Sequence, residues 1–327
     1  MPNYALRDIA IHIVVFIAIC FFVIDIRRFL QLLLRWFYFM RRSKLRFWLF
    51  LAPALISFTI ICVIPMLIGF YFSFTNWDGV NMNPAVVGFD NFVRMFTSDS
   101  DFLRALLFTA AVAVVTIVLV NVFGLALAMF VMQKFRGANL LRSVLFMPNL
   151  IGGLLLGFTW NFIFTNVFSA VGTALNLEFL KGWLSNTETG FIGIIILNVW
   201  QMSGYMMIIY IAQLQHIPSS VKEAAKIDGA NWWQTFRSVT FPLVMPAFTI
   251  GLFLSISNSF KMFDQNLALT KGGPYHSTEM LALNIYNSAF SANEYGYAQA
   301  KAIIFLILVA GIGLIQLIVT KKKEVEM

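Results

Sequence analysis

Six long apolar segments limit what this sequence can fold into. Each is longer than the about 20 residues that an α-helix needs to cross a bilayer. Backbone polar groups find no water inside lipid, so such segments cross it as helices. The chain is 60% hydrophobic and 12% charged, too apolar for a water-soluble domain of 327 residues to cover its surface. We predict an all-α fold, a polytopic membrane helical bundle with core spans at residues 47–74, 102–132, 140–164, 191–213, 241–269 and 298–320.

The first 46 residues form an addition ahead of this core. Residues 9–24 are apolar but shorter than a usual span, and basic residues interleaved with Leu, Trp and Phe follow them. That second pattern is typical of a basic helix at a membrane interface. We expect one extra N-terminal helix that spans the membrane, with residues 1–46 lying wholly in the interface as the alternative. No small-x-small site follows the apolar run, so we expect no cleaved signal peptide.

The charge distribution orients the spans. The net charge is +8. Successive spans place the connecting segments alternately on the two sides of the membrane, and sixteen of the 23 Lys and Arg residues fall in the segments of one side. Basic residues favour the cytoplasmic side. The loop between the fourth and fifth spans and the tail 321–327 are therefore predicted to be cytoplasmic. The excess charge suits contact with anionic lipid, and nothing in its arrangement indicates nucleic acid.

A patterned polar stretch, residues 217–246, interrupts the apolar segments. Pro218 stops the preceding helix. Ser220 and Glu223 have the S-x-x-E spacing of a capping box, which predicts a short helix through residue 227.

A bend and a second helix are predicted to follow. Gly229 stands where a left-handed residue ends a helix, directly after Asp228. Asn231 can cap a second helix over 232–239, which is expected to end before Pro242. The apolar side of this hairpin needs a partner groove, unless the hairpin simply lies on its own protein. That side is formed by Ala224, Ala225, Ile227, Trp232, Trp233 and Phe236.

These residues carry a resemblance. Glu223-Ala224-Ala225, then Gly229, then Val239-x-Phe241-Pro242 resembles the EAA loop, here at 217–242, of membrane permeases in binding-protein-dependent ATP-binding-cassette (ABC) importers. Val239 and Phe241 depart from the usual Ile and Leu. Asp228-Gly229-Ala230 is similar to the carbohydrate branch of the family. A second similarity lies in Leu269-Thr270-Lys271-Gly272-Gly273-Pro274, followed by Ile285-Tyr286 and Ala289-Phe290. The resemblance covers roughly residues 47–320, the expected transmembrane domain.

The resemblance implies a type I ABC importer permease core in the bacterial inner membrane, of the maltose/oligosaccharide class. It implies a heterodimer with a second related permease, two ATPase subunits that hold ATP and Mg, and an extracytoplasmic solute-binding protein. Sugars, above all di- or oligosaccharides, would cross by alternating access. Glycerol phosphate and polyols remain alternative substrates. The residues implied to couple this chain to the ATPase are Glu223, Ala224, Ala225, Asp228 and Gly229.

Motifs for catalysis are absent from the sequence. It contains no G-x-x-x-x-G-K-[ST] phosphate loop, no H-E-x-x-H and no G-x-S-x-G, and its three His residues have no metal-ligand spacing. We expect no enzyme activity, no metal site and no cofactor bound by this chain itself.

Polar residues inside the spans are candidates for a substrate path, because polarity there is costly and usually faces the bundle interior. Amide and hydroxyl groups suit a sugar. The alternative role is hydrogen bonding between helices. The candidates are Asn149, Gly153, Asn198, Gln201, Tyr205, Asn258, Ser259 and Met262.

Lys261 and Asp264 lie three residues apart in the expected fifth span and are predicted to form a structural ion pair. The alternative is a proton relay, which would make the chain an ion-coupled secondary carrier. A third possibility is a membrane scaffold without transport activity.

Overall fold

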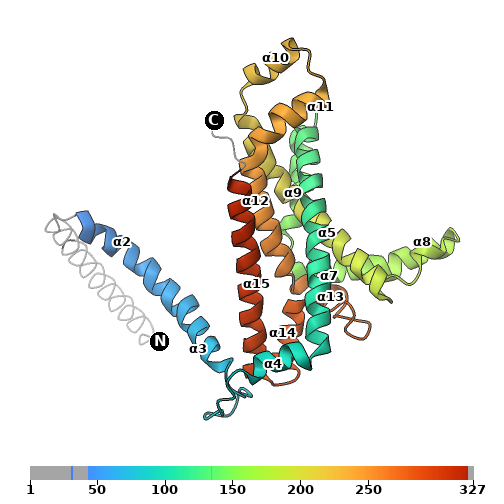
Figure 1. Ribbon diagram of the computed structural model, residues 1–327. Coiled ribbons are helices and arrows are strands. Elements are labelled where there is room, and N and C mark those ends of the chain that lie inside the picture. Colours follow the sequence, from blue (N-terminus) through green and yellow to red (C-terminus); the bar gives the residue numbers. More distant parts are fainter. Residues whose placement is uncertain (1–30, 32–42, 134, 323–327) are drawn as a thin grey trace, which may run out of the picture. The chain divides into compact units, whose positions relative to one another are not determined.

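The computed structural model describes residue 31 and residues 43–133 and 135–322 (Figure 1). The predicted all-α fold is confirmed: apart from an isolated bridge between Thr75 and Val86, the regular structure of these residues is helical. Six helices among them are long and apolar enough to cross a membrane: Phe47–Phe72, Ser100–Val131, Gly153–Ala174, Thr187–His216, Trp232–Phe260 and Tyr295–Lys321. The expected extra helix at residues 9–24 lies outside the described residues.

The chain divides into two compact units, Met1–Ile68 and Gly69–Met327. In the first unit, α2 (Ser43–Phe58) continues through a π-helical turn (Thr59–Val63) into α3 (Ile64–Phe72), whose last residues belong to the second unit. Large apolar side chains on all sides of this helix are exposed, and none of its most apolar window is buried. A helix that is apolar all round is suited to lipid or to another membrane subunit.

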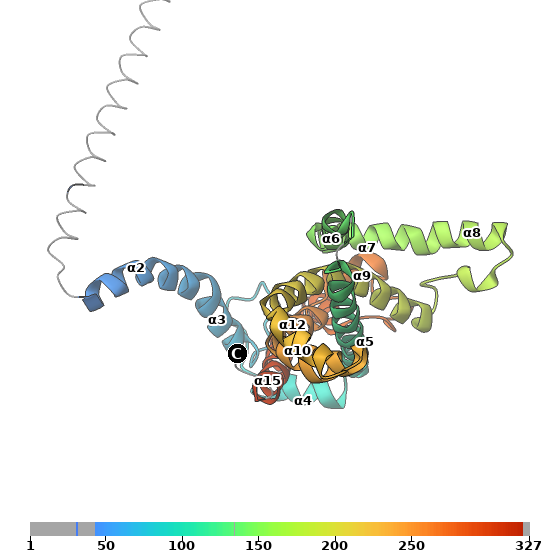
Figure 2. The same ribbon diagram turned by 90° about the horizontal axis from the view of Figure 1, so that it is seen from above.

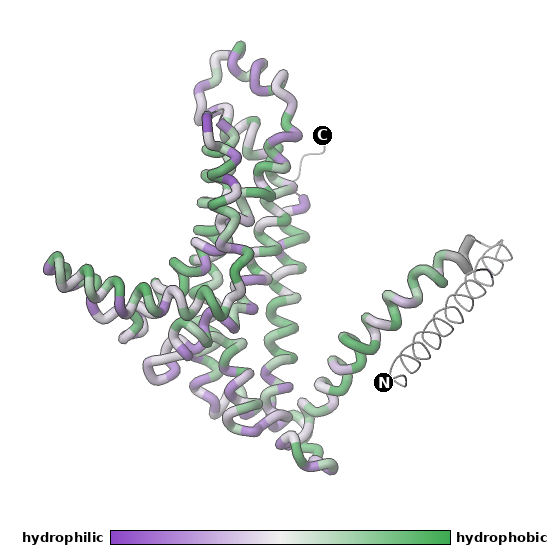
Figure 3. The backbone as a smooth tube through the Cα atoms, turned by 180° about the vertical axis from the view of Figure 1, so that it is seen from behind, coloured by the Kyte–Doolittle hydropathy of each residue, from purple (hydrophilic) through white to green (hydrophobic). Residues whose placement is uncertain are grey.

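The second unit is a bundle around α9 (Thr187–His216). The long helix α5 (Ser100–Val131) packs along α9, α12 (Phe241–Phe260) packs on both, and α15 (Tyr295–Lys321) lies against α12 (Figures 1 and 2). The tube through these long helices is predominantly hydrophobic along its length (Figure 3). Shorter elements of this unit include α4 (Asp90–Thr97), η4 (Glu178–Leu180), α13 (Asp264–Leu269) and α14 (Leu281–Phe290).

The predicted span at 140–164 is wrong in its extent. The chain forms α6 (Ala138–Phe146) and a 3-10 turn (Met147–Leu150), and then breaks into extended backbone at Ile151 and Gly152. Pro148 supplies no backbone N–H to continue α6, which explains the break. The spanning helix starts after it, as α7 (Gly153–Phe162), a π turn (Ile163–Val167) and α8 (Phe168–Ala174) in succession. This rod extends sideways from the bundle (Figure 2).

The predicted span at 241–269 is also wrong at both ends. α11 (Trp232–Thr235) runs through a π turn (Phe236–Thr240) directly into α12, so the expected stop before Pro242 does not occur. A π turn re-registers the hydrogen bonds of a helix, which accommodates the missing N–H of Pro242. At the other end the helix stops at Phe260, and the turn at Lys261–Phe263 separates it from α13.

A buried hydrogen-bonded trio connects three of the long helices. Tyr210 Oη donates to Asn121 Oδ1 (2.6 Å), and Asn121 Nδ2 donates to Ser255 Oγ (2.9 Å). All three side chains are buried. Because lipid is as apolar as Leu, such bonds and close packing hold membrane helices together in place of the hydrophobic effect.

Gly204 shows how close that packing is. A Cβ placed on Gly204 would lie 1.8 Å from the backbone oxygen of Leu145, whereas a Cβ on Gly311 would meet nothing within 4 Å. We expect Gly204→Ala to lower the free energy of unfolding by about 1–3 kcal/mol, because α6 must move away from α9. Gly311→Ala, also within a helix, is the matched control and should be neutral or slightly stabilising. Unfolding in mixed detergent micelles measures both, and equal stability of the two variants would contradict this account.

Candidate functional site

The cytoplasmic loop expected from the charges folds as a helical hairpin. Its first helix, α10 (Ser219–Ile227), starts after Pro218 without a side-chain cap, so the predicted capping box of Ser220 and Glu223 is wrong. Gly229 has φ +75°, as predicted for the bend. Its N–H donates to the Lys226 carbonyl (3.1 Å), and the Ala230 N–H donates to the Ala225 carbonyl (3.0 Å). These two bonds form a Schellman motif, which ends α10 sharply.

The second helix of the hairpin begins with a complete capping box. Asn231 Oδ1 accepts from the Gln234 N–H (2.9 Å), and Gln234 Oε1 accepts from the Asn231 N–H (2.7 Å). The cap predicted at Asn231 is confirmed. Both turns of backbone are thus fixed by local bonds, and the hairpin is a preformed element.

Most of the predicted apolar side of the hairpin is exposed. Ile227 is 85% exposed, Trp232 67% and Trp233 56%. Both Trp rings stack on Phe236, with centroids 5.7 and 5.6 Å apart. Ala224 and the candidate residues Glu223, Asp228 and Gly229 are exposed, whereas Ala225 is buried. Large exposed aromatic side chains on a polar loop indicate a surface that another protein or the membrane covers.

A polar pocket of about 270 Å³ lies where α9 meets the two breaks in the helices. It is lined by Asn149, Asn198, Gln201, Met202, Asn258, Lys261, Met262 and Gln265. The structure therefore brings together five of the eight candidate path residues, from three segments distant in sequence. Breaks in helices at membrane depth expose backbone polar groups, and these are tolerated where they line a cavity.

Hydrogen bonds tie the walls of this pocket together. Gln265 Nε2 donates to Gln201 Oε1 (3.0 Å), and Gln201 Nε2 donates to the Ile151 carbonyl (3.4 Å). Asn198 Nδ2 lies 3.8 Å from the sulfur of Met262. The amide chain thus crosses from α13 through α9 to the break before α7. Its members are rotatable donors and acceptors with which a polyhydroxylated ligand can exchange hydrogen bonds.

Three of the candidate residues lie outside the lining of this pocket. Tyr205 packs against the apolar core between α5 and α9, and Ser259 is buried. Gly153 has a packing role, since a Cβ there would lie 2.8 Å from the Cβ of Asp264. Close contact between α7 and α13 therefore depends on a residue as small as glycine at this position.

Gln265 was not among the predicted path residues, although its spacing from Asn258 and Met262 is helical. The predicted ion pair between Lys261 and Asp264 is wrong. These two exposed residues flank the turn between α12 and α13, and no ion pair joins them in the described structure. The helix break places them out of the i, i+3 geometry that the prediction assumed.

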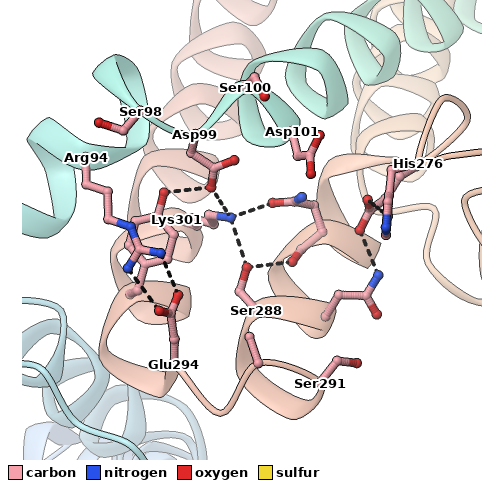
Figure 4. Close-up of a pocket in the computed structure, with 15 residues that line it drawn as sticks. Arg94, Ser98, Asp99, Ser100, Asp101, His276, Ser288, Ser291, Glu294 and Lys301 are labelled. Carbon is pink, nitrogen blue, oxygen red and sulfur yellow. Dashed lines mark hydrogen bonds and ion pairs between the residues drawn. The ribbon is translucent and has the colours of Figure 1, made fainter.

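A buried ion pair lies at the opposite end of the bundle from the hairpin (Figure 4). The Lys301 ammonium contacts Asp99 Oδ2 (2.7 Å), Asn284 Oδ1 (2.8 Å) and Ser288 Oγ (2.9 Å). The Lys301 side chain is 2% exposed. The Tyr297 hydroxyl also donates to Asp99 Oδ2 (2.7 Å). One buried cation thus links α15 to α14 and to the start of α5, a role for Lys301 that the sequence alone did not indicate.

Asp99 caps α5 as well, because its Oδ1 accepts from the Phe102 N–H (2.8 Å). Burial acts to raise the pKa of Asp99, but the hydrogen bonds from Lys301, Phe102 and Tyr297 outweigh it and hold the pKa below its ordinary value. The Asp99 carboxylate is therefore ionised at neutral pH.

The second motif of the resemblance forms a compact loop after α13. Asn266 fastens it: its Nδ2 donates to the Thr278 carbonyl (2.8 Å) and its Oδ1 accepts from the Met280 N–H (3.0 Å). This loop thereby fixes α13, which supplies Gln265 to the polar pocket, against the start of α14.

Comparisons with known proteins assign the chain to a group. The family model described as the binding-protein-dependent transport system inner membrane component matches residues 120–325. A probable starch degradation products transport system permease protein of Thermoanaerobacterium thermosulfurigenes is 52% identical over 286 residues, which cover 88% of this chain and 97% of that relative. A multiple sugar-binding transport system permease protein of Streptococcus mutans is 36% identical over 279 residues, 85% of this chain and 96% of the relative.

The fold is also that of a solved importer. A chain in the crystal structure of a bacterial ABC transporter involved in the import of the acidic polysaccharide alginate matches with a TM-score of 0.75 at 21% identity, covering 88% of this chain and 99% of that one. Sequence, fold and membrane spans agree. This chain belongs to the family of inner membrane components of binding-protein-dependent transport systems, as a multi-pass permease subunit.

Proposed function

We propose that this permease serves an ATP-driven importer of sugars, with di- or oligosaccharides as the favoured substrates. The observation that carries the proposal is the polar pocket, in which amide side chains from three segments meet at two helix breaks. Amides both donate and accept, so they can match the alternating hydroxyl groups of a sugar. The names of the relatives that are 52% and 36% identical, which refer to starch degradation products and multiple sugars, support the same class.

The pocket of about 270 Å³ is slightly below the about 300–1,000 Å³ typical of ligand sites. We infer that a second, related permease completes it, as expected of a heterodimer that encloses its path between two bundles. Asn149, Asn198, Gln201, Asn258 and Met262 are then path residues, together with Gln265. Gly153, Tyr205 and Ser259 act by packing.

We further infer that energy enters through the hairpin. Two ATPase subunits, which hold ATP and Mg, would receive α10 and the bend at Gly229 in a groove of one of them. The exposed Ile227 beside the bend supplies the apolar contact that such a groove buries. An extracytoplasmic solute-binding protein would deliver the sugar on the opposite side. Glu223, Ala224, Ala225, Asp228 and Gly229 remain the proposed coupling residues.

Gln201→Leu tests the path. We expect the apparent KM for oligosaccharide uptake to rise about 3–10-fold, because one hydrogen bond contributes about 0.5–1.5 kcal/mol and Gln201 joins two walls of the pocket. Gln213→Leu is the matched control. Gln213 lies on the same helix and donates to the Leu243 carbonyl (2.9 Å), away from the pocket. Uptake of labelled maltotriose by proteoliposomes that hold the complete importer measures both variants.

An unchanged KM for Gln201→Leu, or an equal rise for both variants, would contradict this assignment. Glycerol phosphate and a polyol belong in the same assay as competitors. Lys261 lines the pocket and offers a cation to an anionic substrate. Competition by glycerol phosphate that exceeds competition by maltotriose would favour this second substrate class.

A further inference from the structure

A groove of about 570 Å³ separates the hairpin from the bundle. Met129 and Phe130 at the end of α5 form one wall, and Trp232 and Phe236 form another. Lys222 and Lys226 of α10 line the same groove. It is thus apolar on two sides and basic on a third, at the level where α5 and α9 end.

The two lysines are arranged to act together. They are four residues apart, so they share one face of α10. Neither takes part in an ion pair or a side-chain hydrogen bond within the described structure. Ile227 and Gly229 are exposed at the tip of the hairpin. A protein that grips the tip therefore leaves the groove behind α10 to another occupant.

The surroundings of the groove are strongly basic. At this end of the bundle the described acidic residues are Glu223 and Asp228, and the described basic residues are Arg136, Arg142, Lys222, Lys226, Arg237, Lys321 and Lys322. Such a surplus favours an anion, and at the end of membrane spans the abundant anions are lipid headgroups of the cytoplasmic leaflet.

We propose that this groove binds an anionic phospholipid, with its phosphate between Lys222 and Lys226. The part of an acyl chain nearest the headgroup would lie against Met129, Phe130 and Phe236. The apolar walls decide between a lipid and a free phosphate, since they contribute only to a ligand that carries hydrocarbon. Phe130 is 51% exposed and continues the apolar outer surface of α5 into the groove, which gives the acyl chain a path from the bilayer. Trp232, 67% exposed, begins the spanning helix Trp232–Phe260, and amphipathic rings at the ends of spans favour the headgroup region. The inference does not depend on which substrate the permease carries.

Native mass spectrometry of the purified full chain, titrated with phosphatidylglycerol or phosphatidylcholine, tests the proposal. We expect phosphatidylglycerol to bind about tenfold more weakly to Lys222→Gln/Lys226→Gln than to the unmodified chain, because each surface lysine favours an anionic lipid several-fold. The control Lys321→Gln/Lys322→Gln removes the same charge from the C-terminal end of α15 and should change binding less than twofold. Lys222→Arg/Lys226→Arg should retain binding. Should the double Gln variant be unstable, Lys226→Gln alone at its exposed position should still weaken binding about threefold.

Three results would overturn the proposal. An equal loss of phosphatidylglycerol binding in the Lys222/Lys226 and Lys321/Lys322 double variants would mean that basic residues attract the lipid diffusely, without a specific site. Binding of phosphatidylcholine as tight as that of phosphatidylglycerol would mean that the lysines do not select for an anionic headgroup. Displacement of the lipid by millimolar glycerol phosphate would mean an anion site to which the apolar walls contribute nothing.

Discussion

Gly229→Pro is expected to abolish coupled transport while the chain remains in the membrane. Gly229 has φ +75°, and proline is restricted to φ near −65°. Proline also removes the N–H that bonds the Lys226 carbonyl. The two losses cost about 3 kcal/mol or more at the bend, which lowers the population of the native hairpin roughly 100-fold. The rate of ATP-driven uptake should fall by a similar factor. Uptake and ATP hydrolysis by reconstituted importer should separate, with hydrolysis persisting.

Gly229→Asn is the matched control for that experiment. A Cβ at this position meets nothing within 4 Å, and Asn adopts the left-handed region more readily than most residues. Uptake should stay within about threefold of the original. Glu223→Lys, which leaves the backbone of α10 intact, should also uncouple hydrolysis from uptake by reversing an exposed charge of the proposed ATPase contact. Normal uptake by both Gly229→Pro and Glu223→Lys would refute the coupling role of the hairpin.

Lys301→Met is expected to lower the free energy of unfolding by about 3–5 kcal/mol, the usual cost of breaking a buried ion pair. Methionine keeps most of the length of the side chain but leaves the Asp99 carboxylate without its counter-charge. The side chains of Asn284 and Ser288 lose the same partner. Unfolding of the purified chain in mixed detergent micelles measures the change.

Lys181→Met provides the comparison for Lys301→Met. Lys181 pairs with Glu178 at 2.6 Å, but its side chain is 33% exposed and that of Glu178 is 82% exposed. Solvent screens this second pair, so its loss should cost about 1 kcal/mol or less. The double variant Asp99→Asn/Lys301→Met should be less destabilised than the sum of its single variants, because it leaves no uncompensated charge. Similar effects of Lys301→Met and Lys181→Met would show that the buried pair does not hold α14, α15 and α5 together.

The apolar segments predicted the helical bundle because a backbone inside lipid must satisfy its own hydrogen bonds, which helices do. The positions at which helices begin and end were harder to predict. Pro242 looked like a stop, yet a π turn carries the helix through it, whereas Pro148 does end a helix where Gly152 and the extended Ile151 follow. The difference depends on tertiary packing, which local propensity does not contain. The bend at Gly229 and the cap at Asn231 were predictable because their bonds connect residues only a few positions apart.

The candidate path could be predicted in part for a similar reason. Asn198 and Gln201 share a face of one unbroken helix, so their spacing carried over into the structure. Gln265 was missed, and Lys261 was paired wrongly, because a turn interrupts the helix that the sequence suggested between them. Lys301 could not be recognised as a linking residue, since its partner Asp99 is distant in the chain and only folding brings the two together.

The π turn at Phe236–Thr240 has a mechanical consequence. By joining α11 to α12 without a break in the helical backbone, it makes residues Trp232–Phe260 one continuous 29-residue helix, whose far end carries Asn258 beside the polar pocket. A displacement of the hairpin end therefore reaches the amides at the other end through unbroken helical backbone, and the π turn and Pro246 are the positions at which this helix bends.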